Sequence, residues 1–426
     1  MISVEEALER ILSYANVLEP EEKPILEALG QVLAEDVFAS SNIPPLDNSA
    51  MDGYALQAAS TVGASPSAPV ELGVIGELAA GYVFEGEVTP DTAVRIMTGA
   101  PVPKAADAVV PFEDTEEAVH RAPRTARRLD EAVRILREAR PGDNIRRAGE
   151  DIHEGQRVLA KGVILRPAEI GMLASVGRTT VKVIRRPVVA VLSTGDELME
   201  VGQTIPPGRI YDSNSYSVAA LIQRYGGIPR VLGIAPDTVE ALVAKIRQGL
   251  DADMLLTSAG VSRGDYDMVK DVLVREGEID FWTVAMKPGK PLAFGLFRSG
   301  QRRIPHIGLP GNPVSSMVSF ELFARPAILK MMGKTNWQKP LIRAVAKERI
   351  VNRNDPRRYF ARCIVTEEDG RYYASLTGPQ GSGILSSMAA ANALTVIPED
   401  VDVVEQGDEI TVMMLDWSQG SEWSTA

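Results

Sequence analysis

Apolar side chains recur near the start of the chain at the 3,4 spacing of an amphipathic helix, at Val4, Ala7, Leu8, Ile11 and Leu12. Ser3 followed by Glu6 resembles a capping box, so the pattern predicts a helix from Val4 to Tyr14. A second helical pattern runs from about Pro24 to Asp36. It ends before the pair Pro44-Pro45, which forces extended backbone.

The pattern then changes to short β-prone runs, from about Val70 to Val110, with Gly and Pro between them. A basic connection follows near residues 121–140. Closely spaced turn residues at 149–162 precede Pro167 and a predicted helix through Met172, Leu173 and Ala174. We interpret this region as a β-rich lobe, about residues 45–143, inserted into a helical N-terminal and linker region of residues 1–180.

Buried-strand runs alternate with helical patterns from Arg186 to about Gly333, as in a parallel-sheet domain of residues 186–333. The predicted strands are 188–192, 230–234, 254–258 and 281–284, and the predicted helices are 215–224, 238–248 and 267–275. After a break at Trp337 to Pro340, strand patterns at 341–350, 359–365, 372–376 and 394–398 predict a small β domain of residues 338–415.

Composition limits the class of protein. A chain of 426 residues suggests two to four domains at roughly 100–200 residues each. The 45% apolar and 24% charged content is typical of a globular protein. The sequence contains no apolar run of membrane-spanning length and no signal-like N-terminus, so we expect a cytoplasmic protein. A net charge of −12 disfavours nucleic-acid binding, and an anionic ligand therefore requires a local basic pocket.

Cysteine and histidine usage argues against a zinc site, a disulfide and a cysteine nucleophile. Cys363 is the only thiol, and His120, His153 and His306 are scattered without ligand spacing, which makes a zinc site improbable. A single cysteine cannot close an intrachain disulfide and fits a reducing compartment. Cys363 lies in an alternating segment, and we predict a packed thiol rather than a nucleophile.

Ligands of open α/β sheets bind beyond the carboxyl ends of the strands, which directs attention to the loops there. Ser193, Thr194 and Gly195 could line a phosphate, and Glu197 could hold a metal or a ribose, although an ordinary polar turn is the alternative. In the loop after the third strand, the small residues Ser258, Gly260 and Ser262 suit backbone approach to a phosphate. Asp267 in that loop is either functional or a helix N-cap.

Two further loops carry candidate anion-binding groups. Lys287 and Lys290 lie in a proline-restricted loop that suits phosphate or a tetrahedral oxyanion, with surface lysines as the alternative. Pro310, Gly311, Asn312 and Pro313 precede a helical stretch, so that free backbone amides could face the same anion unless the segment is only a tight turn.

Several motifs occur together in one order: DNSAMDGYA, RIMTGAPVP, NIRRAGEDI, STGDEL, YDSNS, TSAGVSRGDYD, KPGKP and GLPGNPVS. In these motifs the chain resembles the MoeA and gephyrin E-domain family, over roughly residues 3 to 415. The resemblance implies an α/β multidomain fold. It comprises a Rossmann-like (MogA-like) three-layer domain, a helical and β-rich N-terminal region with an inserted β lobe, and a small C-terminal β domain.

The same resemblance implies a molybdopterin molybdenumtransferase. Such enzymes take adenylylated molybdopterin and molybdate, release AMP with Mg²⁺, and leave molybdenum on the dithiolene. They are homodimers whose site combines the Rossmann-like domain of one subunit with N-terminal elements of the other. Transient contacts with a molybdopterin adenylyltransferase and with apo-molybdoenzymes are implied as well, and no nucleic acid or membrane is expected.

Carried over by position, the resemblance implies catalytic roles for Asp47, Thr98, Asp151, Asp237, Asp267, Lys287 and Lys290, and metal binding by Glu197 and Asp267. Pro310 and Pro313 would shape their loop, and Ser382 in Gly381-Ser382-Gly383 would be the contribution of the C-terminal domain. The rival interpretations are the preceding molybdopterin adenylyltransferase, which lacks the long N-terminal half, and a non-catalytic pterin- or nucleotide-binding scaffold. The retained lysines and acidic residues argue against a pure scaffold.

Overall fold

The computed structural model describes residues 1–118, 132–258, 275, 277–352 and 355–416. The chain forms two compact units. The larger unit comprises Met1–Lys23, Ala28–Ala34 and Lys182–Ala426, and the smaller unit comprises Pro24–Glu27 and Glu35–Val181. The first helix therefore belongs to the same compact unit as the parallel-sheet segment.

Helix α1 (Val4–Tyr14) has the bounds that its 3,4 pattern predicts. The Ser3 side chain accepts a hydrogen bond from the Glu6 backbone N–H at 3.0 Å and so caps the first turn. The apolar face packs into the main core of the larger unit, against the π-helix η4 (Phe320–Ala324) and helix α7 (Arg325–Met331).

The helix predicted at residues 24–36 is wrong. The segment consists of the end of strand β1 (Pro20–Pro24), turns and extended backbone. Its later part pairs with strand β11 (Thr180–Ile184): Ala34 N–H donates to Lys182 O, and Ile184 N–H donates to Val32 O, both at 2.8 Å. Pairing with a segment about 150 residues away outweighs the weak local preference for helix.

A six-stranded sheet forms the centre of the larger unit, in the order β15-β12-β16-β20-β19-β17. Its strands are β12 (Val188–Thr194), β15 (Ile228–Ala235), β16 (Met254–Ser258), β17 (Gly277–Thr283), β19 (Pro291–Ser299) and β20 (Arg302–Leu309). The predicted strands β12, β15 and β16 are parallel, and so is β20, which was not predicted. The strand predicted at 281–284 falls in β17, which is antiparallel, as is β19. The sheet is therefore mixed, and the β19–β20 hairpin went unpredicted because continuous apolar runs lack a strand period.

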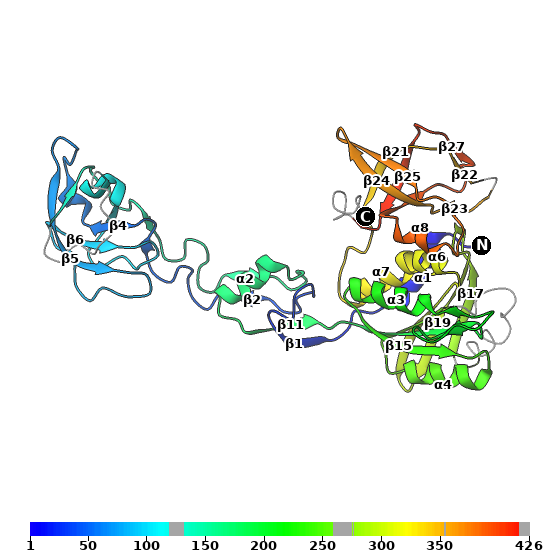
Figure 1. Cartoon of the computed structure of the whole chain (residues 1–426). Helices are drawn as coiled ribbons and strands as arrows, with labels where there is room; N and C mark the ends of the chain where they lie inside the picture. The colour runs from blue at the N-terminus through cyan, green and yellow to red at the C-terminus, as the bar shows by residue number, and fades with distance from the viewer. Residues whose placement is uncertain (119–131, 259–274, 276, 353–354, 417–426) are drawn as a thin grey trace. The chain divides into compact units, whose positions relative to one another are not determined.

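Alternate residues of β12 face opposite cores, as expected for a strand buried on both sides. Val189 and Val191 contribute to the core beneath α1, α3 (Ser213–Arg224), α6 (Pro313–Ser319), η4 and α7. Ala190 and Leu192 contribute to the core beneath α4 (Val239–Gly249). Helices thus cover both faces of the sheet (Figure 1), and the predicted three-layer Rossmann-like domain is confirmed. The helix predicted at 267–275 falls almost wholly outside the described residues.

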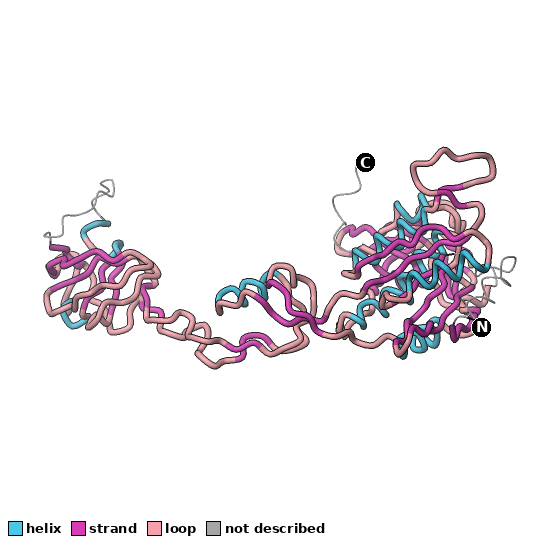
Figure 2. Tube along the Cα trace, turned by 90° about the horizontal axis from the view of Figure 1, so that it is seen from below, coloured by secondary structure: helices cyan, strands magenta, loops and turns pink. Residues whose placement is uncertain are grey.

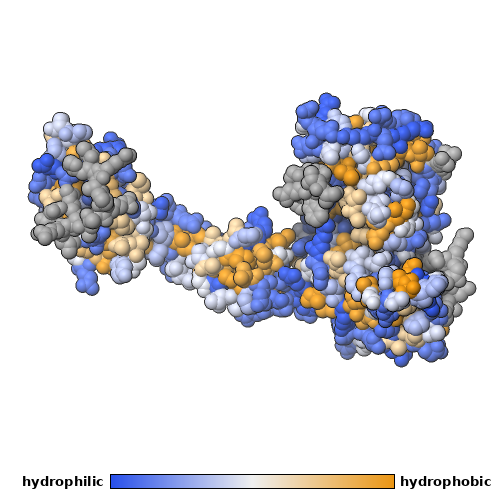
Figure 3. All heavy atoms as spheres, in the orientation of Figure 1, coloured by the Kyte–Doolittle hydropathy of each residue, from blue (hydrophilic) through white to orange (hydrophobic). Residues whose placement is uncertain are grey.

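The C-terminal part of the larger unit is a closed barrel of strands β21-β25-β24-β26-β28. Its strands are β21 (Leu341–Ala346), β25 (Arg371–Leu376), β24 (Arg362–Glu368), β26 (Ala393–Val396) and β28 (Glu409–Met414), with helix α8 (Leu385–Ala389) beside them. Hydrophilic side chains cover most of the barrel face seen in Figure 3. Cys363 lies in the barrel core, and burial raises its pKa to about 12, so the predicted packed thiol is confirmed.

The smaller unit contains a five-stranded sheet in the order β7-β4-β6-β5-β8, and Figure 2 shows this lobe as mostly strand and loop. Its strands are β4 (Gly53–Leu56), β5 (Val70–Leu78), β6 (Thr92–Ile96), β7 (Ala108–Pro111) and β8 (Ala132–Ile135), with short helical turns η1 (Ala58–Thr61), η2 (Phe112–Asp114) and η3 (Glu116–Ala118). Helix α2 (Pro167–Ser175) lies where the sequence predicts it.

Short strand pairs complete the fold. In the smaller unit they are β2 (Val37–Phe38) with β10 (Arg157–Leu159), and β3 (Asn48–Ser49) with β9 (Ile145–Arg146). In the larger unit they are β13 (Leu198–Met199) with β14 (Ile210–Tyr211), β18 (Met286–Lys287) with β23 (Arg358–Tyr359), and β22 (Ile350–Val351) with β27 (Val403–Val404). The strand predicted at 341–350 is therefore two strands, β21 and β22.

Candidate functional site

The carboxyl ends of the parallel strands meet at one edge of the central sheet. Strands β12, β15, β16 and β20 end there, at Thr194, Ala235, Ser258 and Leu309. Strand β19 begins at the same edge, because it runs antiparallel to β20. The fold therefore brings Asp237, Lys290 and Pro310 to the edge where ligands of such sheets bind.

The loop after β12 contains a glycine whose conformation the chain requires. Gly195 has φ +144°, and a Cβ atom there would lie 2.6 Å from Glu197 Oε2. The Glu197 carboxylate thus folds back over Gly195, on the exposed side of the loop. Asp196 and Asp237 exchange backbone N–H to carboxylate hydrogen bonds of 3.3 and 3.2 Å, which join the loops after β12 and β15.

The Ser193 hydroxyl is buried and has a structural role. It donates to Asp212 Oδ1 at 3.0 Å and lies 2.9 Å from Ser215 Oγ, and all three residues are buried. Asp212 caps helix α3 by accepting from the Ser215 backbone N–H. The neighbouring Thr194 is also buried, so Glu197 is the predicted site residue that this loop exposes.

Asn214 joins three segments at this edge and had no role in the sequence interpretation. Its Nδ2 atom donates to Ser258 Oγ and to Gly311 O, each at 2.7 Å. These bonds tie the ends of β16 and β20 to the start of α3. Its motif YDSNS signalled the family, but nothing in the spacing showed that one amide would link two distant loops.

The loop after β20 meets the C-terminal domain. Asn312 is the N-cap of α6, and Pro313 is its first residue. The Val314 backbone N–H donates to Ser382 O at 3.1 Å, which places the predicted Ser382 beside the loop of Pro310 and Gly311.

Arg362 fixes the segment that carries Ser382, and the sequence interpretation missed it. The side chain is fully buried, and burial lowers its pKa. It donates to the backbone oxygens of Pro379, Gln380 and Gly381 at 3.0–3.1 Å, and to Ser387 Oγ at 2.9 Å. An arginine at a buried position of an alternating strand was the available signal.

The two predicted lysines have different surroundings. Lys287 Nζ lies 4.6 Å from the Tyr359 ring centroid and 3.7 Å from Asp355 Oδ2. Lys290 is exposed and makes no side-chain hydrogen bond or ion pair to a described residue. Between them Gly289 has φ +101°, and a Cβ there would lie 2.7 Å from Ser319 Oγ. The loop is therefore packed tightly at its centre, and its Lys290 side chain is free of ion pairs with the part of the chain that the structure describes.

The three N-terminal motifs meet within the smaller unit. Asp47 accepts from the Ala148 backbone N–H at 2.7 Å and from Arg147 at 2.6 Å, and these contacts lower its pKa although burial opposes them. Val102 N–H donates to Asp47 O at 2.9 Å, which joins the loop of Thr98 to the loop of Asp47. Thr98 donates through its backbone N–H and its hydroxyl to Asp52, and Asp151 N–H donates to Ile43 O.

Three predicted site residues, Gly260, Ser262 and Asp267, lie outside the described residues. Within the described ranges, no group of three or more His, Cys, Asp or Glu side chains is arranged to hold a metal ion. The oxygen donors that remain at the sheet edge suit a hard cation, because Mg²⁺ is commonly held by one or two carboxylates together with substrate phosphates. Glu197, the predicted metal ligand that lies within the described residues, therefore fits Mg²⁺ only as part of a site that a phosphorylated ligand completes.

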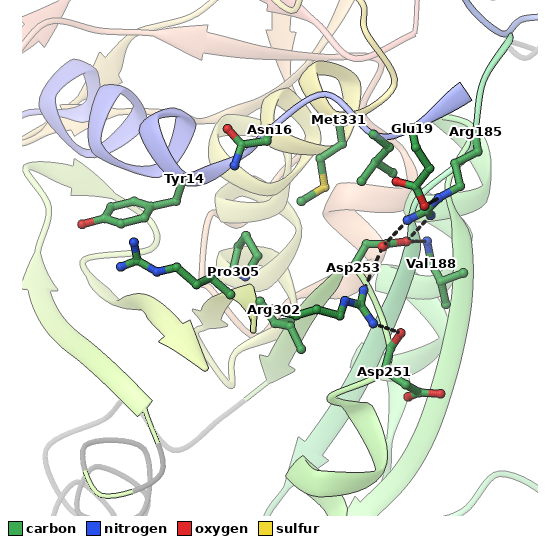
Figure 4. Close-up of a pocket in the computed structure, with 13 residues that line it drawn as sticks. Tyr14, Asn16, Glu19, Arg185, Val188, Asp251, Asp253, Arg302, Pro305 and Met331 are labelled. Carbon is green, nitrogen blue, oxygen red and sulfur yellow. Dashed lines mark hydrogen bonds and ion pairs between the residues drawn. The ribbon is translucent and has the colours of Figure 1, made fainter. Parts of the chain in front are cut away.

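A separate cavity of about 460 Å³ lies at the opposite, amino edge of the sheet. Figure 4 shows Arg185, Arg302 and Asp253 pointing toward one another there. Arg185 forms two hydrogen bonds of 2.6 Å with Asp253 and a third of 2.6 Å with Glu19. The charged side chains of this cavity neutralise one another, which indicates a structural ion-pair network rather than the ligand site.

His306 makes folding of the larger unit sensitive to acid. It is fully buried on β20, 3.0 Å from Thr257 Oγ1, and burial lowers its pKa to about 3. The unfolded chain binds a proton below about pH 6.5, whereas the folded chain does not, so stability falls as the pH falls. Between pH 6.5 and 5 the free energy of unfolding should drop by about 2 kcal/mol from this residue.

The measurement is urea unfolding followed by tryptophan fluorescence, which reports on the larger unit because the 4 tryptophans of the chain fall in its ranges. His306→Gln should flatten the dependence on pH, and the exposed His153→Gln should leave it unchanged. An equal slope in wild type and His306→Gln would disprove this assignment.

The fold and the site together define a class. A three-layer domain with its polar loops at one sheet edge, joined to a β lobe and a closed barrel, is a multidomain Rossmann-like protein. Among the described residues, no helix combines the length and apolar character needed to cross a membrane.

Comparisons with known proteins identify the family. Three family models match in order: "MoeA N-terminal region (domain I and II)" over residues 2–177, "Probable molybdopterin binding domain" over 190–330, and "MoeA C-terminal region (domain IV)" over 343–415. A molybdopterin molybdenumtransferase 2 of Mycobacterium tuberculosis is 39% identical over 97% of this chain and 99% of its own length. A molybdopterin molybdenumtransferase of Haemophilus influenzae is 37% identical over 91% of each chain.

Solved structures agree with the sequence relatives. Two structures of a molybdopterin biosynthesis MoeA protein from Pyrococcus horikoshii are each 32% identical, with TM-scores of 0.80 and 0.76. They cover 98% and 97% of this chain and 100% of their own. The chain belongs to the MoeA family, the family of the molybdopterin molybdenumtransferases, and this places it in molybdenum-cofactor biosynthesis. The family and the enzyme class expected from the motifs are confirmed.

Proposed function

We propose that this chain inserts molybdate into adenylylated molybdopterin and releases AMP. The observation that carries the proposal is the gathering, at one sheet edge, of the Glu197 and Asp237 carboxylates, the KPGKP lysines and the loop before α6. A phosphoanhydride and a tetrahedral oxyanion are both anions, and this edge supplies cations, backbone amides and hard oxygen donors for them.

The residues of this chain act mainly by positioning and by electrostatics. Lys290, which has no ion-pair partner among the described residues, supplies an ammonium group for molybdate or phosphate oxygens. Lys287, held between Tyr359 and Asp355, supplies a second. The amides at the start of α6 and the 381–383 segment complete an anion pocket, in which Ser382 is fixed by Arg362 through its neighbours.

Glu197 is the first metal ligand of the proposal, and Asp267 is the second. Mg²⁺, when bound there, would neutralise charge on the scissile phosphoanhydride. The dithiolate that receives molybdenum belongs to the substrate. Because the substrate supplies the sulfur ligands, a protein that handles molybdenum can contain a single, buried cysteine.

The direct test mixes purified protein with adenylylated molybdopterin, MgCl₂ and molybdate, and follows AMP by chromatography. We expect AMP to appear only when molybdate and magnesium are both present. Absence of AMP under these conditions would favour the non-catalytic pterin- or nucleotide-binding scaffold. Formation of AMP from ATP in the absence of adenylylated molybdopterin would favour a different reaction, the hydrolysis of a free nucleotide.

The proposal includes a homodimer in which Asp47, Thr98 and Asp151 of the smaller unit serve the site of a second copy. Mixed dimers test it. Lys290→Ala and Asp151→Asn should each be inactive alone, whereas a refolded equimolar mixture should recover about one quarter of wild-type activity, because half of the dimers are mixed and each contains one intact site. A mixture as inactive as its components would contradict shared sites.

We also infer domains of residues 1–180, with the inserted lobe at about 45–143, 186–333 and 338–415. The change of pattern at Arg186 and the break at Trp337 to Pro340 support these boundaries. Transient contacts with a molybdopterin adenylyltransferase and with apo-molybdoenzymes follow from the reaction, since its substrate must arrive and its product must leave. A single reduced thiol favours the cytoplasm as its compartment.

A further inference from the structure

The C-terminal domain places a carboxylate against one of the two site lysines. Asp355 Oδ2 lies 3.7 Å from Lys287 Nζ, and the Asp355 and Lys287 side chains are 16% and 36% exposed. The contact is not an accident of two flexible chains, because β18 and β23 pair in parallel register. Phe360 N–H donates to Lys287 O at 2.8 Å, so the lysine and the C-terminal segment are fixed to each other.

Asp355 itself is held by an arginine. Arg357 donates to Asp355 through two hydrogen bonds, of 2.6 and 2.5 Å. The buried Asn352 donates to the backbone oxygens of Asp355 and Arg357, which fixes the turn between them. Hydrogen bonding with Arg357 lowers the pKa of Asp355, so the carboxylate is charged at neutral pH.

Lys287 therefore faces a negative charge before any ligand binds. An oxyanion that binds Lys287 must compete with the carboxylate already there. Arg357 limits that competition, since its guanidinium donates two hydrogen bonds to the carboxylate in a bidentate geometry that a lysine does not match. Lys290, by contrast, has no such competitor among the described residues.

We propose that Asp355, restrained by Arg357, is a positioning and specificity residue that sets how strongly Lys287 binds an oxyanion. The proposal rests on the proposed function of the same site, to which the C-terminal domain adds a carboxylate that competes with the oxyanion for Lys287. Anion binding shifts Asp355 from a bond shared between Lys287 and Arg357 to one with Arg357 alone. Weak anions lose this competition, and a doubly charged tetrahedral anion wins it.

Direct binding of molybdate alone, measured by calorimetry on the full chain, tests the proposal without any turnover. Asp355→Asn removes the competing charge and should tighten molybdate binding about fivefold, the scale of a partly exposed ion pair. Arg357→Gln leaves Asp355 to Lys287 alone and should weaken binding about fivefold. Asp355→Glu should restore a value close to that of wild type.

A double-mutant cycle separates an effect of Asp355 through Lys287 from a general effect of its charge on molybdate binding. In the Lys287→Met background, Asp355→Asn should no longer change molybdate affinity. Asp369→Asn is the matched control, because it removes the same charge from an exposed turn of the same domain, in a conformation that asparagine tolerates. It should leave affinity unchanged.

The proposal is wrong if Asp355→Asn leaves molybdate affinity unchanged or weakens it. It is also wrong if Asp355→Asn still changes molybdate affinity in the Lys287→Met background. In steady-state assays the same variant should lower KM for molybdate with kcat retained, which a loss of structure would not do. If the protein binds molybdate with these dependences but releases no AMP, the proposed function fails and the Asp355 proposal stands.

Discussion

Lys290→Ala is expected to lower molybdate-dependent AMP release by about 10²- to 10³-fold, the usual cost of removing one preorganised group that stabilises charge in a transition state. Lys290 is exposed at the sheet edge and has no partner among the described residues, so its charge is available to a ligand. Because no described side chain depends on Lys290, its removal should not destabilise the fold. The loss should therefore appear in activity with the unfolding midpoint unchanged.

The matched control is Lys347→Ala in the C-terminal barrel, where the lysine pairs with Glu368 on the surface. Surface pairs of this kind contribute about 0–1 kcal/mol to stability, and activity should stay at the wild-type level. Lys290→Arg keeps the charge but not the compact ammonium, and it should recover part of the rate. Wild-type turnover by Lys290→Ala would remove the lysine from the site and leave Lys287 as the cation to test.

The elements that the sequence predicted well are those whose local pattern agrees with their tertiary contacts. Helix α1 has a 3,4 stripe that packs into the core, and β12 is a β-branched run buried on both faces. Residues 24–36 have a helical composition, but their backbone bonds go to residues near 182, which no local window contains. The same limit hid the antiparallel β19–β20 hairpin, whose apolar runs fit a buried strand of either direction.

In the candidate site, too, residues recognisable from local sequence were predicted, whereas residues whose roles depend on distant contacts were missed. Motifs pointed to Glu197 and the two lysines, and the family resemblance added Asp237, because loops at the ends of strands can be recognised one at a time. The residues that hold those loops in place were invisible in the sequence. Asn214, Arg362 and Asp355 act on segments that are far from them along the chain or in another domain, so their roles depend on the folded arrangement.

Asp253→Asn should lower the free energy of unfolding of the larger unit by about 3 kcal/mol, because it removes the buried carboxylate that Arg185 and Arg302 both contact and leaves Arg185 with the exposed Glu19. The Asp253 side chain is 5% exposed and accepts from Arg185, Arg302 and the Val188 backbone N–H. Its replacement by the isosteric amide keeps the shape of the network and changes only charge and donor pattern.

The effect should depend on pH in a defined direction. Burial of Asp253 acts to raise its pKa, but Arg185, Val188 and Arg302 outweigh burial, and the net pKa is lowered. Its stabilisation is therefore complete above the unfolded value of about 4 and is lost as the pH falls through the lower folded value. Wild type and variant should thus begin to converge in stability as the pH falls below about 4, and the convergence should be complete only below the folded pKa of Asp253.

Asp251→Asn is the matched control at the same sheet edge. Asp251 pairs with Arg230, but its side chain is 70% exposed, and we expect at most about 1 kcal/mol from its loss. Urea unfolding followed by tryptophan fluorescence, at pH 7 and at a series of pH values below about 4, measures both variants. Equal losses from Asp253→Asn and Asp251→Asn would show that burial does not decide the strength of this network. A loss of about 3 kcal/mol for Asp253→Asn alone would establish that the pair of buried Asp253 with Arg185 stabilises the amino edge of the sheet.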